Sequence, residues 1–192
     1  MFKILDEACT PTRGTKYSAA IDLRSREDIT IGAGETVLVP LGVKIDFDKL
    51  KPLLQEKLSF FNVASFGTLN KETIFEQFLK SHYLQLMLRS GLCKKGLILP
   101  NGVGVIDLDY QDEIMMIIHR PIKRVNVFGD VADEMLGNEE VLTDIKVVLT
   151  SDFKIKKGDR VGQITLLEHK SYLFGVDSDE VRSGGFGSTG SK

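Results

Sequence analysis

The last part of the chain brings together residue types that bind phosphates and stack on bases. Arg182 carries a planar guanidinium that can bind an anion through two hydrogen bonds, and the glycine-rich stretch after it holds an aromatic ring, Phe186. The backbone N–H groups of the glycines, Gly187 among them, and the hydroxyls of Ser188 and Thr189 could wrap a polyphosphate while the ring stacks on a base. The stretch is not a Walker A loop, because no lysine precedes the Ser-Thr pair. A Gly/Ser spacer is the alternative, but a spacer has no use for an aromatic ring.

Three short clusters earlier in the chain also combine glycine with charged or hydroxyl residues. Residues 89–92 (Arg-Ser-Gly-Leu) directly follow a strand pattern, and residues 158–163 (Gly-Asp-Arg-Val-Gly-Gln) form a turn that enters another strand. Residues 101–110 begin with Asn-Gly between apolar runs, which is typical of a β-hairpin. In that segment we expect Asp107 and Asp109 to point to one face, where an acid could orient or deprotonate a water. Taken singly, each cluster has a plain alternative as a surface turn.

Strand patterns position these clusters. Apolar residues fall on alternate positions over residues 37–47, which indicates one half-buried strand, and residues 84–88 repeat the alternation just before the Arg-Ser-Gly-Leu cluster. Residues 113–118 are continuously apolar after the first, as in a strand buried on both faces. Further strand candidates are residues 146–149 and 161–167. The chain is therefore predicted to be all-β.

Three stretches depart from the strand pattern. Between residues 48 and 81 the apolar residues fall on helical faces, which predicts two short inserted helices. Residues 130–144 are rich in acids and indicate a loop or an extended hairpin. From Ser178 onward apolar residues nearly vanish, so we expect a flexible tail.

Length and composition fit one ordinary soluble domain. The chain has 192 residues, 42% of them hydrophobic and 27% charged, with a net charge of −2. This balance excludes a disordered chain and gives no reason to expect nucleic acid or an anionic membrane as a partner. Cys9 and Cys93 lack CxxC spacing and the three histidines are scattered, so neither a disulfide framework nor a zinc site is expected. With no secretory signal and no apolar run of membrane-spanning length, we expect a cytoplasmic protein.

Together with Ala-Ala-Ile-Asp-Leu at residues 19–23, the four clusters stand in the order of five motifs known from one enzyme family. From Ala19 to Gly190 the chain resembles the trimeric dUTPases, the deoxyuridine 5′-triphosphate nucleotidohydrolases. The resemblance implies Mg²⁺-dependent hydrolysis of dUTP to dUMP and pyrophosphate, which keeps uracil out of DNA. It also implies a jelly-roll-like β-barrel assembled as a homotrimer, with active sites that draw on all three subunits. On that plan residues 1–181 form the barrel domain, and residues 182–192 form a mobile arm that closes a neighbouring active site.

Carried over by position, the resemblance assigns roles around the base, the sugar and the metal. Asp107 would hold and activate the water that attacks the α-phosphorus. Tyr110 would pack against the deoxyribose, and Asp22 would reach Mg²⁺ through water. The residues expected to read the uracil are Asn101, Gly104, Val105, Ile106 and Met115.

A second set of roles concerns the phosphates. Ser90 and the Gly91 amide would contact the phosphate chain near the scissile bond, with Arg89 beside them. Gln163 would assist at the α-phosphate, and Arg160 would support the same side of the phosphate site. The arm would cover the uracil with its aromatic ring and grip the γ-phosphate; its residues are Arg182, Phe186, Gly187, Ser188 and Thr189.

The chain departs from the family pattern at several places. Ala20-Ile21 stand where a Gly-Tyr pair is usual, and Asp112 replaces the usual glycine of the third motif. Insertions at about 48–81 and 123–144 lie between motifs, either as decoration on the outside of the barrel or as a surface for a protein partner. Two functional alternatives therefore stand beside dUTP hydrolysis. The scaffold could act on a modified dUTP, or it could serve a regulatory role through the insertions; dCTP deaminases share the fold but lack the arm.

Overall fold

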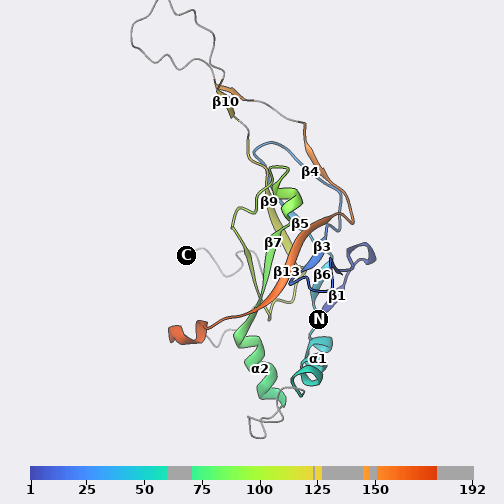
Figure 1. Ribbon diagram of the computed structural model, residues 1–192, viewed down its shortest axis with the longest axis vertical. Helices are drawn as coiled ribbons and strands as arrows, with labels where there is room; N and C mark the ends of the chain where they lie inside the picture. Colours follow the sequence, from blue (N-terminus) through green and yellow to red (C-terminus); the bar gives the residue numbers. More distant parts are fainter. Residues whose placement is uncertain (60–70, 123, 127–144, 148–150, 177–192) are drawn as a thin grey trace, which may run out of the picture.

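The computed structural model describes residues 1–59, 71–122, 124–126, 145–147 and 151–176. They are mostly β, with a few short helices (Figure 1). The strands are β1 (Phe2–Ile4), β2 (Thr12–Arg13), β3 (Ile21–Arg24), β4 (Ile29–Ile31), β5 (Thr36–Pro40), β6 (Val43–Ile45), β7 (His82–Leu88), β8 (Gly104–Asp107), β9 (Met115–His119), β10 (Arg124–Asn126), β11 (Ile145–Val147), β12 (Phe153–Ile155) and β13 (Arg160–Glu168). The helices are η1 (Glu7–Cys9), α1 (Phe47–Ser59), α2 (Lys71–Ser81), α3 (Ser90–Cys93) and η2 (Ser171–Phe174).

One five-stranded antiparallel sheet has the order β2-β3-β13-β7-β8 and carries motif residues on β3, β8 and β13. Four two-stranded antiparallel sheets, β1-β6, β4-β12, β5-β9 and β10-β11, complete the pairing. β13 pairs with both β3 and β7, so it brings the first, second and fourth motifs side by side although they are distant in the sequence. None of these sheets closes into a barrel among the described strands.

The strand predicted over residues 37–47 is two strands in different sheets, so that prediction is wrong in its extent. The chain breaks at Gly42, which has a positive φ of 63°. A Cβ at this glycine would lie only 2.5 Å from the Cβ of Cys9, so the close approach also requires glycine. The Gly42 N–H donates to Oε1 of Glu113 at 2.7 Å, which fixes the break against the loop before β9. Alternation alone could not reveal a break that keeps the apolar period.

The segment predicted to be buried on both faces forms β9, and burial on both faces is wrong. Met116 and Ile118 are fully buried, whereas Met115 and Ile117 are only partly covered. The physical reason is that the second face of β9 borders a cavity, whose lining includes Met115 and Ile117.

The hairpin predicted over residues 101–110 is present only in part. Asn101 and Gly102 do form a turn, in which Gly102 has a φ of 73°. The strand after it, β8, pairs with β7 across the short helix α3, and not with the segment just before the turn. Asp109 lies in the turn after β8, so the strand alternation that predicted one face for Asp107 and Asp109 does not extend to it.

The two helices predicted within residues 48–81 are confirmed as α1 and α2, which lie at the lower end of the molecule in Figure 1. Leu50 of α1 is 2% exposed, and Phe75 and Phe78 of α2 pack against the core. This packing favours the interpretation of the first insertion as decoration on the β framework. No described helix is long and apolar enough to span a membrane.

Two of the other strand predictions, 84–88 and 161–167, are confirmed within β7 and β13. The predicted strand 146–149 overlaps β11, which begins one residue earlier, and its last two residues lie outside the described part. The acidic stretch 130–144 and the tail from Ser178 also lie outside the described residues.

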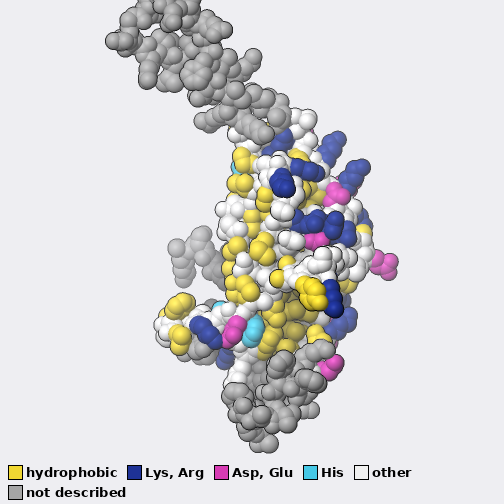
Figure 2. All heavy atoms as spheres, viewed as in Figure 1, with side chains coloured by type: hydrophobic (Ala, Val, Ile, Leu, Met, Phe, Trp, Pro, Cys, Tyr) yellow, Lys and Arg dark blue, Asp and Glu magenta, His cyan; other side chains and the backbone are white. Residues whose placement is uncertain are grey.

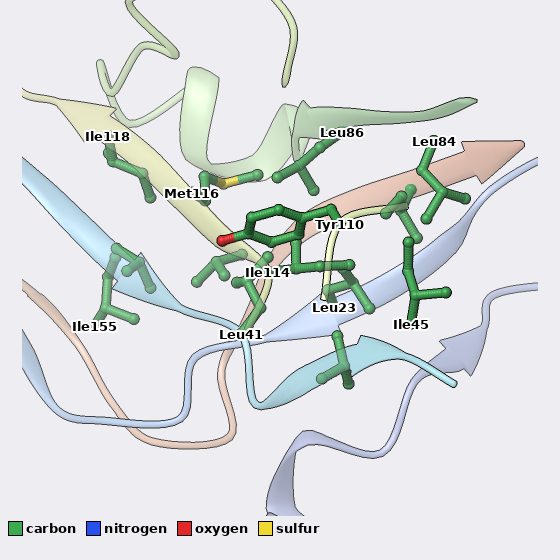
Figure 3. Close-up of a cluster of buried hydrophobic side chains, with 14 of the residues drawn as sticks. Leu23, Leu41, Ile45, Leu84, Leu86, Tyr110, Ile114, Met116, Ile118 and Ile155 are labelled. Atoms are coloured by element: carbon green, nitrogen blue, oxygen red, sulfur yellow. The ribbon is translucent and has the colours of Figure 1, made fainter. Parts of the chain in front are cut away.

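Buried aliphatic side chains from both ends of the chain form one core, shown in Figure 3. Leu23 of β3, Leu86 of β7 and Met116 of β9 are each at most 2% exposed. Burying a side chain of this size contributes about 1.5–3 kcal/mol. The core therefore anchors the three strands whose ends carry the candidate site.

Candidate active site

A pocket of about 230 Å³ lies beside β8 and β9, at the edge of the core. Six of the seven residues that the sequence assigned to the base and the sugar line it: Asn101, Gly104, Val105, Ile106, Tyr110 and Met115. The seventh, Phe186, lies outside the described residues. The other lining residues, which the sequence analysis did not assign to the site, are Leu86, Leu99, Ile114, Met116 and Ile117. The alternating and continuous apolar runs contain four of them, but nothing in an apolar run distinguishes a pocket wall from the core.

The backbone of β8 forms one wall of this pocket because β8 lies close against β7. A Cβ at Gly104 would come within 3.1 Å of the Cβ of Leu86, so a side chain there would push β8 away from its partner strand. Glycine therefore keeps the backbone wall in place. A wall made of peptide groups offers hydrogen-bond donors and acceptors to a ligand, and the positions of these groups do not depend on side-chain rotamers.

Tyr110 is held rigidly at the inner side of the pocket. It is 8% exposed and packs among the core residues that Figure 3 labels. Its hydroxyl donates to the carbonyl of Glu113 at 3.1 Å, and its N–H donates to the carbonyl of Asp107 at 3.1 Å. These two hydrogen bonds hold Tyr110 against both ends of the turn that follows β8. Its ring can therefore present a rigid surface to a sugar.

Asp107 ends β8 and is exposed. It lies directly opposite Tyr83 of β7 in the register of the two strands, on the same face of β8 as Val105. Val105 is 62% exposed, so this face of β8 is open over the described residues.

The motif residues on β3, β7 and β13 meet at a second place, around Asp22. The Asp22 carboxylate accepts from Nε of Arg89 at 3.0 Å and from Nη1 of Arg160 at 3.1 Å. Gln163, its register partner on β13, donates from Nε2 at 3.3 Å. The Asp22 side chain is 4% exposed, so water cannot replace these partners. We call Asp22, Arg89, Arg160 and Gln163 the arginine cluster.

The arginine cluster was not foreseen as a unit. The sequence predicted that Asp22 reaches Mg²⁺ through water, but both its oxygens face guanidinium groups. The described residues contain no group of three or more His, Cys, Asp or Glu side chains that could hold a metal ion. Mg²⁺ requires an octahedron of oxygen ligands. The described part of one chain therefore does not by itself fit Mg²⁺.

Ser90 and Gly91 begin α3 directly after Arg89, and both are exposed. Apart from its chain neighbours and the backbone of α3, no described atom lies within 4 Å of the position that a Cβ would take at Gly91. The packing of the described chain therefore does not require glycine here, and the position is open to close approach from outside.

Comparison with known proteins supports the family resemblance that the five motifs indicate. The deoxyuridine 5′-triphosphate nucleotidohydrolase of Rickettsia akari is 30% identical over 187 residues, which cover 94% of this chain and 87% of that protein. The enzyme of the same name from Pasteurella multocida is 30% identical over 200 residues, covering 98% of this chain and 95% of that protein. This chain belongs to the dUTPase family. No family model matches it.

Solved structures agree on a dUTPase-like fold. A mutant dUTPase of Staphylococcus bacteriophage 80alpha, solved with dUpNHpp, has a TM-score of 0.54 and 17% identity, and the match covers 100% of this chain and 98% of that chain. The dUTPase of Staphylococcus aureus phage phi11 has a TM-score of 0.53 and 16% identity, covering 98% and 97%.

In this dUTPase-family chain Asp107 and the arginine cluster are far apart. Asp22 of β3 is opposite Gln163 of β13, which is opposite Met87 of β7. Four residues away from Met87 along β7, Tyr83 is opposite Asp107 of β8. With strands about 4.8 Å apart and a rise of about 3.3 Å per residue, Asp107 lies roughly 20 Å from Asp22 on the same sheet face. The arm residues, from Arg182 to Thr189, lie outside the described residues.

Proposed function

We propose that this chain is a dUTP diphosphatase, which hydrolyses dUTP to dUMP and pyrophosphate and so keeps uracil out of DNA. The observation that carries the proposal is the pocket of about 230 Å³, in which six of the seven residues expected around the base and the sugar come together. Full-length similarity to deoxyuridine 5′-triphosphate nucleotidohydrolases supports the same conclusion.

Base selection would follow from the backbone wall of the pocket. The peptide groups of Gly104 and Ile106 would pair with the edge of uracil, and their fixed positions would reject the amine of cytosine. Apolar side chains of the lining would lie against C5 of the base, where the methyl group of thymine would clash with them. Tyr110, which cannot move without breaking two hydrogen bonds, would exclude the 2′-hydroxyl of a ribonucleotide.

Asp107 would act as the general base of the reaction. Its carboxylate would take a proton from a bound water as the water oxygen forms a bond to the α-phosphorus. The bond from that phosphorus to the bridging oxygen breaks, and the electron pair leaves with pyrophosphate. The guanidinium groups of Arg89 and Arg160 would stabilise the negative charge on the phosphates, and Gln163 would donate to the α-phosphate.

The distance of roughly 20 Å between Asp107 and Asp22 supports a site that is shared between subunits. A water held by Asp107 of one chain could not reach an α-phosphate bound at the arginine cluster of the same chain. We therefore include in the proposal the homotrimer and the jelly-roll-like barrel that the family implies, with Asp107 and the arginine cluster of one site contributed by different copies.

We propose that Mg²⁺ would bind together with the phosphates of the substrate. Mg²⁺ is commonly held by substrate phosphates and waters together with one or two carboxylates. The described residues do not form a metal site by themselves, so the proposed steps of hydrolysis rely on side chains of the protein alone.

The test is a panel of dUTP, dTTP, dCTP, UTP and a 5-modified dUTP, with release of pyrophosphate as the readout. We expect a strong preference for dUTP and a loss of at least about a hundredfold in kcat for Asp107→Asn, because general-base catalysis contributes about 10²–10⁴-fold. Equal turnover of dTTP, or an Asp107→Asn variant with intact turnover, would refute the proposal. A higher kcat/KM for the modified nucleotide would select that substrate instead.

A further inference from the structure

A second cleft, of about 270 Å³, lies between α3, β12 and the start of β13. Four cationic residues line it, namely Arg89, Lys95, Lys154 and Arg160, and Asp159 is the only acid in the lining. Figure 2 shows that Lys and Arg side chains gather on the upper half of the described surface. We call this cleft the basic cleft.

The acids near the basic cleft do not neutralise it. Asp159 directs its carboxylate into its own turn, where Oδ2 accepts from the Lys156 N–H at 2.9 Å. Asp22 is shared between Arg89 and Arg160. Even with both acids counted against the four cations, the cleft keeps a net charge of two positive.

Lys95 and Lys154 supply this excess, and both lie outside the five motifs. Neither has a carboxylate partner among the described residues. Lys95 is held instead by an aromatic ring, with its ammonium 5.7 Å from the ring centre of Phe153. Because the ring faces the ammonium without neutralising it, Phe153 positions a charge that is still available to an anion.

We propose that Lys95 and Lys154 of the basic cleft bind phosphate in addition to the motif residues Arg89 and Arg160. The inference rests on the proposed function: the ligand would be the phosphate chain of the substrate and the pyrophosphate that it leaves. A compact anion with several negative charges fits a small cleft lined by four cations better than an extended polyanion does. The chain as a whole has a net charge of −2, so its overall charge gives no reason to expect a nucleic acid as the ligand.

The test measures binding and not turnover. Inorganic pyrophosphate and, separately, deoxyuridine are titrated into the full-length protein by calorimetry at low salt. We expect Lys95→Gln and Lys154→Gln each to weaken pyrophosphate binding by about three- to fivefold, as for loss of one partly exposed ion pair. Deoxyuridine binding should not change, and Lys95→Arg should bind pyrophosphate nearly as wild type does.

Lys3→Gln is the matched control, since Lys3 is an exposed lysine of β1 outside both cavities. It should leave both affinities unchanged. If Lys95→Gln and Lys154→Gln bind pyrophosphate as tightly as wild type, or if Lys3→Gln weakens binding equally, the basic cleft is not the anion site. Phe153→Leu should weaken pyrophosphate binding less than Lys95→Gln does, because it frees the ammonium without removing its charge.

The two proposals fail separately. Pyrophosphate binding that depends on both lysines, in a protein that does not hydrolyse dUTP, would leave the anion site standing and remove the proposed activity. Hydrolysis of dUTP with unchanged pyrophosphate affinity in both variants would remove only the anion site.

Discussion

Replacing Asp22 by asparagine should destabilise the protein, because it removes the one negative charge on which two guanidinium groups converge. The carboxylate oxygens lie 3.0 Å from Nε of Arg89 and 3.1 Å from Nη1 of Arg160, and the side chain is 4% exposed. Asparagine has nearly the same shape, so the change isolates the charge. Its amide would also place N–H donors against a guanidinium that has no acceptor capacity.

The magnitude follows from the burial of the three side chains. Breaking a buried ion pair by removing one partner costs about 3–5 kcal/mol. The Arg89 and Arg160 side chains are 28% and 46% exposed, so water recovers part of that loss. We expect the free energy of unfolding to fall by about 2–4 kcal/mol. At about 2–4 °C per kcal/mol for a chain of this length, Tm should fall by about 4–16 °C.

Urea and thermal denaturation at one fixed protomer concentration would measure this loss, since unfolding of an oligomer depends on concentration. The control is Asp152→Asn, an exposed aspartate without an ion pair among the described residues, which should change stability by less than about 0.5 kcal/mol. In Asp22→Asn, a further Arg89→Gln change should cost less than it does in the wild type, because its partner is already lost. A loss below about 1 kcal/mol for Asp22→Asn would refute the account of the arginine cluster.

Three further outcomes are expected. Gly42→Ala should lower the free energy of unfolding by more than about 2 kcal/mol in urea denaturation, because its Cβ would meet Cys9 at 2.5 Å and φ is 63°; a neutral change would contradict the strand break. Burial raises the pKa of the Cys9 thiol, whereas Cys93 is exposed, so a thiol reagent should label only Cys93 in the folded protein and both cysteines in urea. A hydrogen bond from Lys157 holds the pKa of Asp6 below its usual value, so the pair stabilises the fold at pH values above the usual pKa and loses this effect as the pH falls through the lowered pKa. Asp6→Asn should therefore flatten the fall of Tm below about pH 4. An unchanged slope of Tm against pH would argue against the pair.

The sequence was most informative where residue type and position act together. The residues expected around the base line one pocket, because a short strand and the turn after it carry most of them. The helical period within residues 48–81 predicted both helices, because an apolar face that must cover a core shows itself in local spacing.

The parts that could not be predicted depend on contacts between distant segments. The break at Gly42 follows from the packing of Cys9, and alternation on both sides of the break gives no sign of it. The convergence of Arg89 and Arg160 on Asp22 depends on the pairing of β13 with two other strands, which no local pattern encodes. The same pairing places Asp107 away from the arginine cluster, a separation that motif order along the chain does not show.

The most direct test of a dUTP-hydrolysing site shared between subunits is complementation of two inactive variants. Asp107→Asn and Gln163→Ala are expressed separately and together, and pyrophosphate release from dUTP is measured for each sample. We expect no turnover from either variant alone. In random mixed trimers about one quarter of the sites should hold an intact Asp107 from one copy and an intact Gln163 from another, and activity should return in that proportion. A wild-type protein that does not hydrolyse dUTP, or mixed trimers that stay inactive, would contradict the account.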